Sequence, residues 1–401
     1  MEVGASWGRR VPSEPSLDII VPEFNELSRQ GEHFGSQMRY LSEVSQTFDV
    51  FLVDDASSDG SWERIVHDSD SGVNHDRLHL IRMKENGRKV LAIKRALQLS
   101  KAEYVLLTDF DSRIVTFSTI FPTLDQFRRS PRLAALSLRV IPEGHSLFSR
   151  MQDVEYAISR GLLNRYLDVQ RKLRCVCGAG SIWRRDFLLE ILKEHSGRHN
   201  GDDMEATAIA MRKGYQVGYE PSVVVKTIVP QSPKEFYKQR RRWDLGALET
   251  YDKERRFYLR EIKKITNRLG QITMLDWYSW ITMILFPYFI FNVIFNGIYH
   301  LSQLIEYQSI QLASAGIIAY AARHEVQRRW ELLLIPVLPF YLMMEAVPRF
   351  AALCQFISDK ISRLRHTLRL RPLSLSLIPL NTEKILARKE ICERMESEIA
   401  A

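Results

Sequence analysis

Two aspartates end a short apolar run near residue 110. The segment YVLLTDFDSRI, residues 104–114, changes from apolar residues to Asp109 and Asp111, which stand one residue apart. In a strand, residues i and i+2 point to the same face, so the two carboxylates can converge on one point. Carboxylates that close together repel each other unless a cation or a proton lies between them. The spacing therefore fits a site for a cation, and the simpler alternative is a solvated turn, because Asp-x-Asp also occurs by chance.

Two further pairs of aspartates stand at the boundaries of predicted strands or helices. In FDVFLVDDASSDGS, residues 48–61, Asp54 and Asp55 end a second apolar run. In NGDDMEAT, residues 200–207, Asp202 and Asp203 follow a glycine and begin a predicted helix, where backbone N–H groups stabilise negative charge. The alternative for this last pair is an ordinary N-cap.

A basic segment, YKQRRRWDLG at residues 237–246, offers a different chemistry. On a helix, Gln239, Arg242 and Trp243 share a face because residues i, i+3 and i+4 are neighbours. An amide, a guanidinium and an indole on one face can hold a phosphate and stack on a sugar ring. The alternative is a solvated basic face just before a membrane.

The elements that would position these residues alternate between strand and helix. Apolar runs predict strands beginning at Leu17 and Phe48 and others over 77–83 and 104–109, and an apolar stripe predicts a helix over 87–100. Pro22 is expected to stop the first strand, because proline cannot continue a central ladder. This order predicts an α/β fold with a mostly parallel sheet and helices on both faces. Ligands bind beyond the carboxyl ends of the strands in such sheets, where the acidic pairs would gather.

Other nucleotide-binding signatures are missing from the sequence. No Gly-x-Gly-x-x-Gly follows the first strand, and no Gly-x4-Gly-Lys-Ser/Thr occurs, so a dinucleotide site and a P-loop both lack support. His195 and His199 are four residues apart, but Gly197 weakens a helix between them and a zinc site is not expected.

A strongly apolar region, residues 277–357, predicts transmembrane helices at the C-terminal side. The segment 277–300 contains no Asp, Glu, Lys or Arg and is long enough to span a bilayer, although a buried core helix is the alternative. The segment 310–322 is short for a span, and 330–357 is long enough but is interrupted by prolines, Glu345 and Arg349. The sequence is therefore compatible with either two or three membrane helices.

Charge and cysteine content limit the environment and the partners. The net charge is +8, and the basic runs border the apolar region, which favours an anionic lipid surface over nucleic acid. The 4 cysteines form no recognisable zinc pattern, so reduced thiols are expected. The first residues have no apolar core, so we expect no signal peptide and a cytosolic catalytic domain at the inner or plasma membrane.

Seven motifs in order resemble those of a known family: VPEFNE, VDDASSDGS, GRKVLAIKRAL, LLTDFDS, CGAGSIWRR, GDDMEAT and QRRRW. The chain is similar to the inverting glycosyltransferases of family two, which have the GT-A (Rossmann-like) fold. The likeness is to the membrane-integrated branch with cellulose, chitin and hyaluronan synthases and the rhizobial chito-oligosaccharide synthase. It covers residues 17–250. The implied organisation is a flexible N-terminus (1–16), a cytosolic GT-A domain (17–250), an interfacial linker helix (251–276), a transmembrane region (277–357) and a basic cytosolic tail (358–401).

The resemblance implies roles for the residues singled out above. The nucleotide would be bound by Pro22, Glu26, Asp54, Asp55, Lys89 and Asp109, with Lys89 near the diphosphate. Asp109 and Asp111 would hold Mg²⁺ or Mn²⁺. Asp203 would be the general base. The acceptor side would be formed by Cys177, Gly178, Asp202, Gln239, Arg242 and Trp243, with the segment 179–184 alongside.

The implied activity is the transfer of a sugar, with inversion, from a UDP-sugar to a growing poly- or oligosaccharide. The chemistry fits the residue types, because a hard cation and basic side chains neutralise the leaving diphosphate, while one carboxylate takes the proton of the acceptor hydroxyl. A membrane lipid as acceptor is the first alternative, and a non-catalytic membrane scaffold is the second. With few membrane helices, polymer export would require a homo-oligomer or a partner.

Overall fold

The computed structural model describes residues 16–70, 76–144, 146–197, 200–285, 288, 291, 309, 313–314, 316–318 and 320–370. The first 15 residues and those from 371 onward lie outside it, and so does most of the apolar segment 286–319. Grouping by contacts divides the chain into Met1–Leu353 and Cys354–Ala401, and in the second unit the structure describes helical residues through Leu370. The domain boundaries expected from sequence stay predictions.

In the described ranges eight strands form one sheet in the order β3-β2-β1-β4-β7-β6-β8-β5. Strands β1 to β4 are parallel, β6 and β8 are parallel to each other, and β7 and β5 run antiparallel to their neighbours. The expected α/β class with a mostly parallel sheet is confirmed. The strands are β1 (Leu17–Glu23), β2 (Asp49–Asp54), β3 (Leu78–Arg82), β4 (Tyr104–Leu107), β5 (Ser112–Ile114), β6 (Leu133–Glu143), β7 (Ser181–Arg184) and β8 (Gln216–Ile228).

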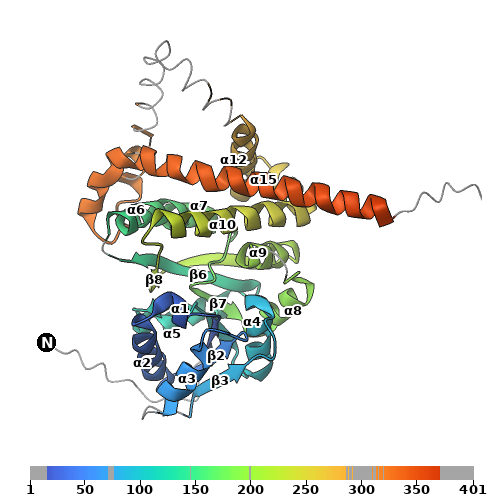
Figure 1. The fold of residues 1–401 in the computed structure, drawn as a ribbon. Helices are drawn as coiled ribbons and strands as arrows, with labels where there is room; N and C mark the ends of the chain where they lie inside the picture. Colours follow the sequence, from blue (N-terminus) through green and yellow to red (C-terminus); the bar gives the residue numbers. More distant parts are fainter. Residues whose placement is uncertain are drawn as a thin grey trace, which may run out of the picture. The chain divides into compact units, whose positions relative to one another are not determined.

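Helices cover both faces of this sheet (Figure 1). Up to β8 they are α1 (Leu27–Gln30), α2 (His33–Ser45), α3 (Ser61–Asp70), α4 (Arg88–Leu99), η1 (Phe117–Thr119), α5 (Ile120–Arg129), α6 (Leu147–Tyr156), the π-helix η2 (Ala157–Leu162), α7 (Leu163–Asp168), α8 (Arg185–Glu194) and α9 (Asp202–Arg212). After β8 follow α10 (Pro233–Lys253), α11 (Arg255–Ile262), α12 (Arg268–Ile284), η3 (Arg329–Val337) and α15 (Leu338–Leu370). Figure 1 shows α10 running over β6 and β8, beside α6 and α7.

Alternation along the strands creates one hydrophobic core on each face. Ile20 and Phe51 join the core with α4, α8 and α9, whereas their neighbours Ile19 and Val50 join the core with α2 and α5. Successive side chains of a strand point to opposite faces, so strands of nearly continuous apolar residues are needed when both faces are covered. The short apolar runs read from the sequence meet this requirement.

The first strand differs from the prediction, because β1 continues through Pro22 to Glu23. The carbonyl of Glu23 accepts a hydrogen bond from Asp55 N on the β2 side, whereas that of Ile20 accepts one from Thr108 N on the β4 side. The pairing of β4 ends at Ile20 and Leu107, so the missing N–H of Pro22 faces a position where the ladder has already stopped. Proline is tolerated there for this reason.

The helix α10 begins as its sequence suggests. The Ser232 hydroxyl accepts a hydrogen bond from Glu235 N at 3.3 Å, and Pro233 occupies the first helical position. Among the described residues, none of the helices combines the length and apolar character needed to cross a bilayer. Of the predicted spans, 277–300 lies mostly outside the described residues, and 330–357 consists of η3 followed by part of α15.

The helices α9 and α10 touch through the backbones of Gly201 and Gly246. A Cβ atom at Gly246 would lie 2.4 Å from Gly201 N, and one at Gly201 would lie 2.6 Å from the Gly246 carbonyl oxygen. Both neighbours are backbone atoms, which cannot move aside as a flexible side chain can. Glycine at both positions is therefore what lets the start of α9 approach α10.

We expect Gly246→Ala to lower the free energy of unfolding by about 1–3 kcal/mol, because overpacking forces the two backbones apart. Chemical denaturation followed by circular dichroism measures this change. The matched control is Gly35→Ala in α2, where a Cβ atom would have its nearest neighbour at 3.5 Å. Alanine should there stabilise the helix by up to about 1 kcal/mol. Equal stability of the two variants would contradict the packing argument.

Candidate functional site

A single cavity of about 1360 Å³ brings most of the predicted site residues together. It lies at the carboxyl ends of the parallel strands and extends beneath α10. Its lining includes Pro22, Glu26, Asp55, Lys89, Asp109, Asp111, Cys177, Asp202, Asp203, Gln239, Arg242 and Trp243. Asp54 and Gly178 do not line it, but each is next in sequence to a residue that does, Asp55 and Cys177. The volume exceeds the roughly 300–1,000 Å³ of a typical small-molecule site, so two substrates can fit side by side.

Asp109 and Asp111 lie in a turn after β4, beyond the end of the strand itself. The strand ends at Leu107, and Ser112 N donates a hydrogen bond to the Asp109 carbonyl oxygen at 3.0 Å before β5 begins. The two carboxylates therefore converge through a turn and not through strand alternation as predicted. Lys89, at the start of α4, donates to Asp109 Oδ1 at 2.6 Å.

Charge repulsion and burial dominate the electrostatics here. Burial, and then the charges of Asp109 and Glu26, raise the pKa of Asp111 to about 7. Burial alone would lower the pKa of Lys89, but the carboxylates of Asp109 and Asp203 raise it well above its usual value. Lys89 therefore stays protonated and offsets part of the negative charge.

The donor atoms of this cluster fit a hard divalent cation. In the described ranges no group of three or more His, Cys, Asp or Glu side chains has the arrangement of a metal site. Mg²⁺ and similar ions are, however, commonly held by one or two carboxylates together with substrate phosphates. Asp109 and Asp111 supply such carboxylates, and burial followed by the negative charges of Asp109 and Glu26 raises the pKa of Asp111.

The residues predicted for the nucleotide lie at the ends of β1 and β2. Asp55 Oδ1 accepts a hydrogen bond from Gly87 N at 2.7 Å, which connects the end of β2 to the start of α4. Asp54 is fully buried, and its Oδ1 accepts one from Ser57 N at 3.0 Å, so it supports the loop. Glu23, which sequence reasoning did not assign, also lines the cavity, and burial next to Asp54 raises its pKa to about 8.

Asp203 is oriented by the segment that precedes β7. Its Oδ2 accepts a hydrogen bond from Gly178 N at 2.8 Å. A Cβ atom at Gly178 would lie 2.3 Å from Asp203 Oδ1, so only glycine permits this contact. The neighbouring Asp202 has a buried Oδ1 without a hydrogen-bond partner among the described residues, and burial followed by the charge of Asp203 raises its pKa to about 6.

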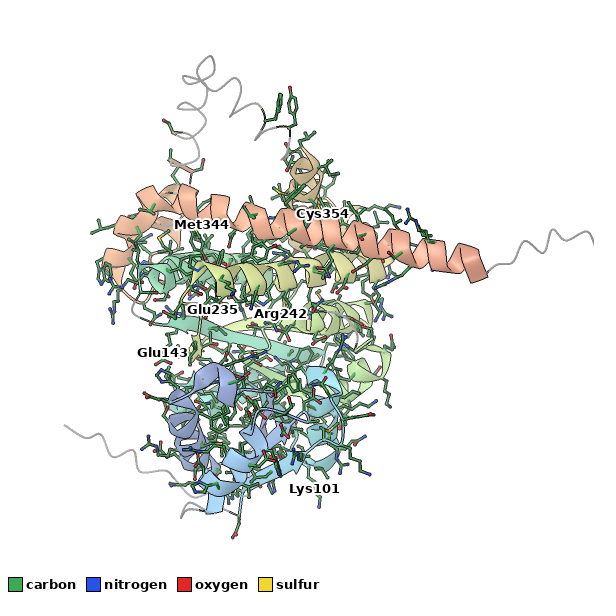
Figure 2. All side chains as sticks on the ribbon, in the orientation of Figure 1. Lys101, Glu143, Glu235, Arg242, Met344 and Cys354 are labelled. Atoms are coloured by element: carbon green, nitrogen blue, oxygen red, sulfur yellow. The ribbon has the colours of Figure 1, made fainter. Side chains whose placement is uncertain are left out.

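The helix α10 presents Gln239, Arg242 and Trp243 to the cavity, and Figure 2 labels Arg242 on it. The Oε1 atom of Gln239 is buried and has no hydrogen-bond partner among the described residues. The intervening Arg240 points into the protein instead, and its Nη1 donates to Glu155 Oε1 at 2.7 Å. The guanidinium of Arg240 also lies 4.5 Å from the centre of the Trp243 ring, which fixes the indole.

Arg160 is among the cationic residues of the cavity that sequence reasoning missed. It lies in the π-helix η2 and its Nη1 is 2.7 Å from Cys177 Sγ. The surrounding residues, VEYAISRGLLNR at 154–165, have the pattern of an ordinary amphipathic helix. No local signal marks the π-turn that brings Arg160 into the cavity.

Comparison with known proteins finds similarity over half of the chain or more. The family model described as glycosyl transferase family group 2 matches residues 104–344. An N-acetylglucosaminyltransferase of Neorhizobium galegae is 26% identical over 250 residues, covering 57% of this chain and 54% of that protein. A poly-beta-1,6-N-acetyl-D-glucosamine synthase of Staphylococcus aureus is 23% identical over 202 residues, covering 50% of this chain and 48% of that protein. The chain thus matches about half the length of these curated relatives.

A solved structure shares the fold. It is a mannosyltransferase from Pyrobaculum calidifontis in complex with GDP-Man and Mn²⁺, with a TM-score of 0.51 and 18% identity. The match covers 84% of this chain and 88% of that chain. At this identity the likeness concerns the fold alone.

The raised pKa of Asp111 predicts a pH dependence of stability in metal-free buffer. The folded protein keeps a proton on Asp111 up to about pH 7, whereas the ordinary pKa of an aspartate is 3.8. The folded state binds more protons between these values, so the free energy of unfolding falls as pH rises through this window. Asp111→Asn removes this loss and should unfold at a higher temperature than the wild type at pH 8. The difference should shrink towards pH 4.

Differential scanning calorimetry across this pH range measures the effect. Asp125→Asn, at an exposed position of α5, is the control and should follow the wild type at every pH. Addition of Mn²⁺ at pH 8 should stabilise the wild type more than Asp111→Asn. An Asp111→Asn variant less stable than the wild type at pH 8 without metal would overturn the assignment.

Proposed function

Because the chain belongs to glycosyltransferase family 2, we propose that it transfers a sugar, with inversion, from a UDP-sugar to a growing β-linked oligo- or polysaccharide. An N-acetylglucosamine donor is favoured by the names of the relatives reported above. Metal dependence and membrane attachment with a cytosolic catalytic domain are part of the same proposal.

The observation that carries the proposal is the meeting of Asp109, Asp111 and Asp203 in one cavity. They come from the turn after β4 and from α9, and Asp203 follows Asp111 by 92 residues in the sequence. Lys89 lies between the groups, since it pairs with Asp109 and its pKa responds to Asp203. A solvated turn or a simple N-cap would not require this convergence.

The donor is assigned to the side of Lys89 and the strand ends. Asp55 and Glu26 line the part of the cavity suited to the nucleoside. A divalent cation held by Asp109 and Asp111 would neutralise charge on the diphosphate as the sugar–phosphate bond breaks. The ammonium of Lys89 stabilises the same developing charge from the protein side.

The acceptor hydroxyl is assigned to Asp203. A hydroxyl is a poor nucleophile, and a carboxylate within hydrogen-bond reach takes its proton as it attacks the anomeric carbon. The hydrogen bond from Gly178 N engages one carboxylate oxygen and leaves the other to face the acceptor. One base and one direct displacement invert the configuration at that carbon. Gln239 and Arg242 on α10 are assigned to hold the bound substrates in place.

A membrane lipid is the second candidate acceptor, because one end of the cavity is lined by α12. Thr282, Met283 and Leu285 line the cavity, while Tyr278 and Ile281 expose 65% and 63% of their surface on the same helix. An apolar helix face beside the cavity fits a lipid better than a sugar chain. Separation of labelled product into organic-extractable and polymer fractions distinguishes the two acceptors.

We expect Asp203→Asn to lower the turnover number by about 10²–10⁴-fold, the range for loss of a general base. Binding of UDP should be unchanged, because the nucleotide contacts lie elsewhere in the cavity. UDP release is measured in a screen of UDP-Glc, UDP-GlcNAc, UDP-GlcA and UDP-Gal with Mg²⁺ or Mn²⁺.

The matched control is Asp125→Asn, which removes an exposed carboxylate of α5 and should leave turnover at the wild-type level. Full UDP release by Asp203→Asn would remove Asp203 as the base. Absence of metal-dependent UDP release by the wild type with every donor would instead favour the non-catalytic scaffold.

A further inference from the structure

Arg160 lines the active-site cavity on a segment of unusual geometry. It belongs to the π-helix η2, Ala157–Leu162, between α6 and α7. π-Turns inside α-helices are rare and occur frequently at functional sites. The guanidinium carbon of Arg160 is 4.4 Å from the centre of the Tyr156 ring and 5.0 Å from that of Trp243. The aromatic rings hold the guanidinium in place and stabilise its charge without neutralising it.

The positive charge of Arg160 has no carboxylate partner in the part of the chain that the structure describes. Its Nη1 contacts Cys177 Sγ at 2.7 Å, and sulfur is a weak acceptor. The adjacent carboxylate of Glu155 is engaged by Arg240 instead. Two other cations of the cavity are paired, Lys89 with Asp109 and Arg174 with Asp276. A sheltered guanidinium without a counter-charge is costly, and it has five N–H donors to offer.

The location of Arg160 assigns it to the acceptor. Cys177, which it contacts, precedes Gly178, whose N–H binds the carboxylate of Asp203. In a direct displacement, the base and the acceptor hydroxyl lie on the side of the sugar opposite the leaving diphosphate. Arg160 contacts the segment that holds the base and is therefore assigned to the acceptor side, whereas Lys89, which pairs with Asp109, is assigned to the diphosphate.

We propose that Arg160 binds an oxyanion carried by the acceptor, either the carboxylate of an acidic sugar or a phosphate, and so selects anionic acceptors. The proposal rests on the proposed function, because it uses Asp203 to define the acceptor side. A guanidinium matches both oxyanions with paired N–H donors, and the negative charge balances its own. A neutral hydroxyl or amide carbonyl would accept a hydrogen bond but leave the charge uncompensated.

The test is a binding titration followed by isothermal calorimetry in the presence of Mn²⁺ and UDP. The probes are an oligosaccharide with glucuronate residues, a neutral oligosaccharide of N-acetylglucosamine with the same length, and inorganic phosphate. The wild type should bind the acidic oligosaccharide about 10-fold or more tightly than the neutral one, as expected for charge-assisted hydrogen bonds. Arg160→Gln should lose this preference. A carboxylate-specific site will ignore inorganic phosphate, whereas a phosphate site will bind it.

Matched variants keep the result interpretable. Arg160→Lys retains the charge without the paired donors and should keep only part of the preference. Arg128→Gln, at an exposed position of α5, should bind every probe as the wild type does. Unchanged affinity for UDP alone shows that Arg160→Gln is folded and that its donor site is intact.

Two results would overturn the proposal: no preference for either oxyanion by the wild type, or a loss of UDP affinity in Arg160→Gln as large as the loss for the acidic probe. The second result would place Arg160 on the donor. Failure of the wild type to bind UDP would contradict the proposed function. This result is distinguishable from failure of the Arg160 proposal, because UDP binding and the preference for an oxyanion are measured in different titrations.

Discussion

Repulsion between carboxylates is the constraint on which the whole site depends. The cavity gathers Asp109, Asp111 and Asp203 from separate parts of the chain, and burial in a protein makes such repulsion larger than in water. Lys89 offsets part of it through its 2.6 Å contact with Asp109. Asp111 accepts hydrogen bonds from the hydroxyls of Ser112 and Thr227, and these bonds lower its pKa. Burial and the neighbouring carboxylates raise the pKa of Asp111 by a larger amount. Such an arrangement is suited to a ligand that brings positive charge, and a metal-bound nucleotide sugar does so.

Close backbone contacts fix the positions of the acidic and basic parts of the site relative to each other. Gly178 touches the carboxylate of Asp203, and Gly201 touches Gly246 of α10. Thr207 adds a further connection, since its hydroxyl accepts from Val176 N at 2.8 Å and donates to the Asp203 carbonyl oxygen at 2.6 Å. The proposed base and the helix that carries Arg242 and Trp243 are therefore positioned by one set of contacts. A change in the position of α10 would also move the start of α9.

Local signals predict the strands and the edge where the acidic pairs gather, but not the details that depend on distant residues. Short apolar runs followed by turn residues identify β1 to β4 well. The continuation of β1 through Pro22 depends on where β4 stops, and the turn at Asp109 depends on the pairing of β5 with β8. Arg160 escapes prediction because a π-helix changes the face on which a residue lies without changing the composition of the segment. Of the apolar region predicted to cross a membrane, residues 277–285 and 320–357 are described, whereas most of the segment 286–319 lies outside the described residues.

Anomalous diffraction from crystals grown with Mn²⁺ and UDP tests the central claim most directly. We expect one manganese peak within bonding distance of carboxylate oxygens of Asp109 and Asp111, beside the diphosphate. Asp203 should lie across the same cavity, on the side left for the acceptor. Nucleotide bound away from this cavity, or a manganese peak that contacts neither Asp109 nor Asp111, would contradict the account.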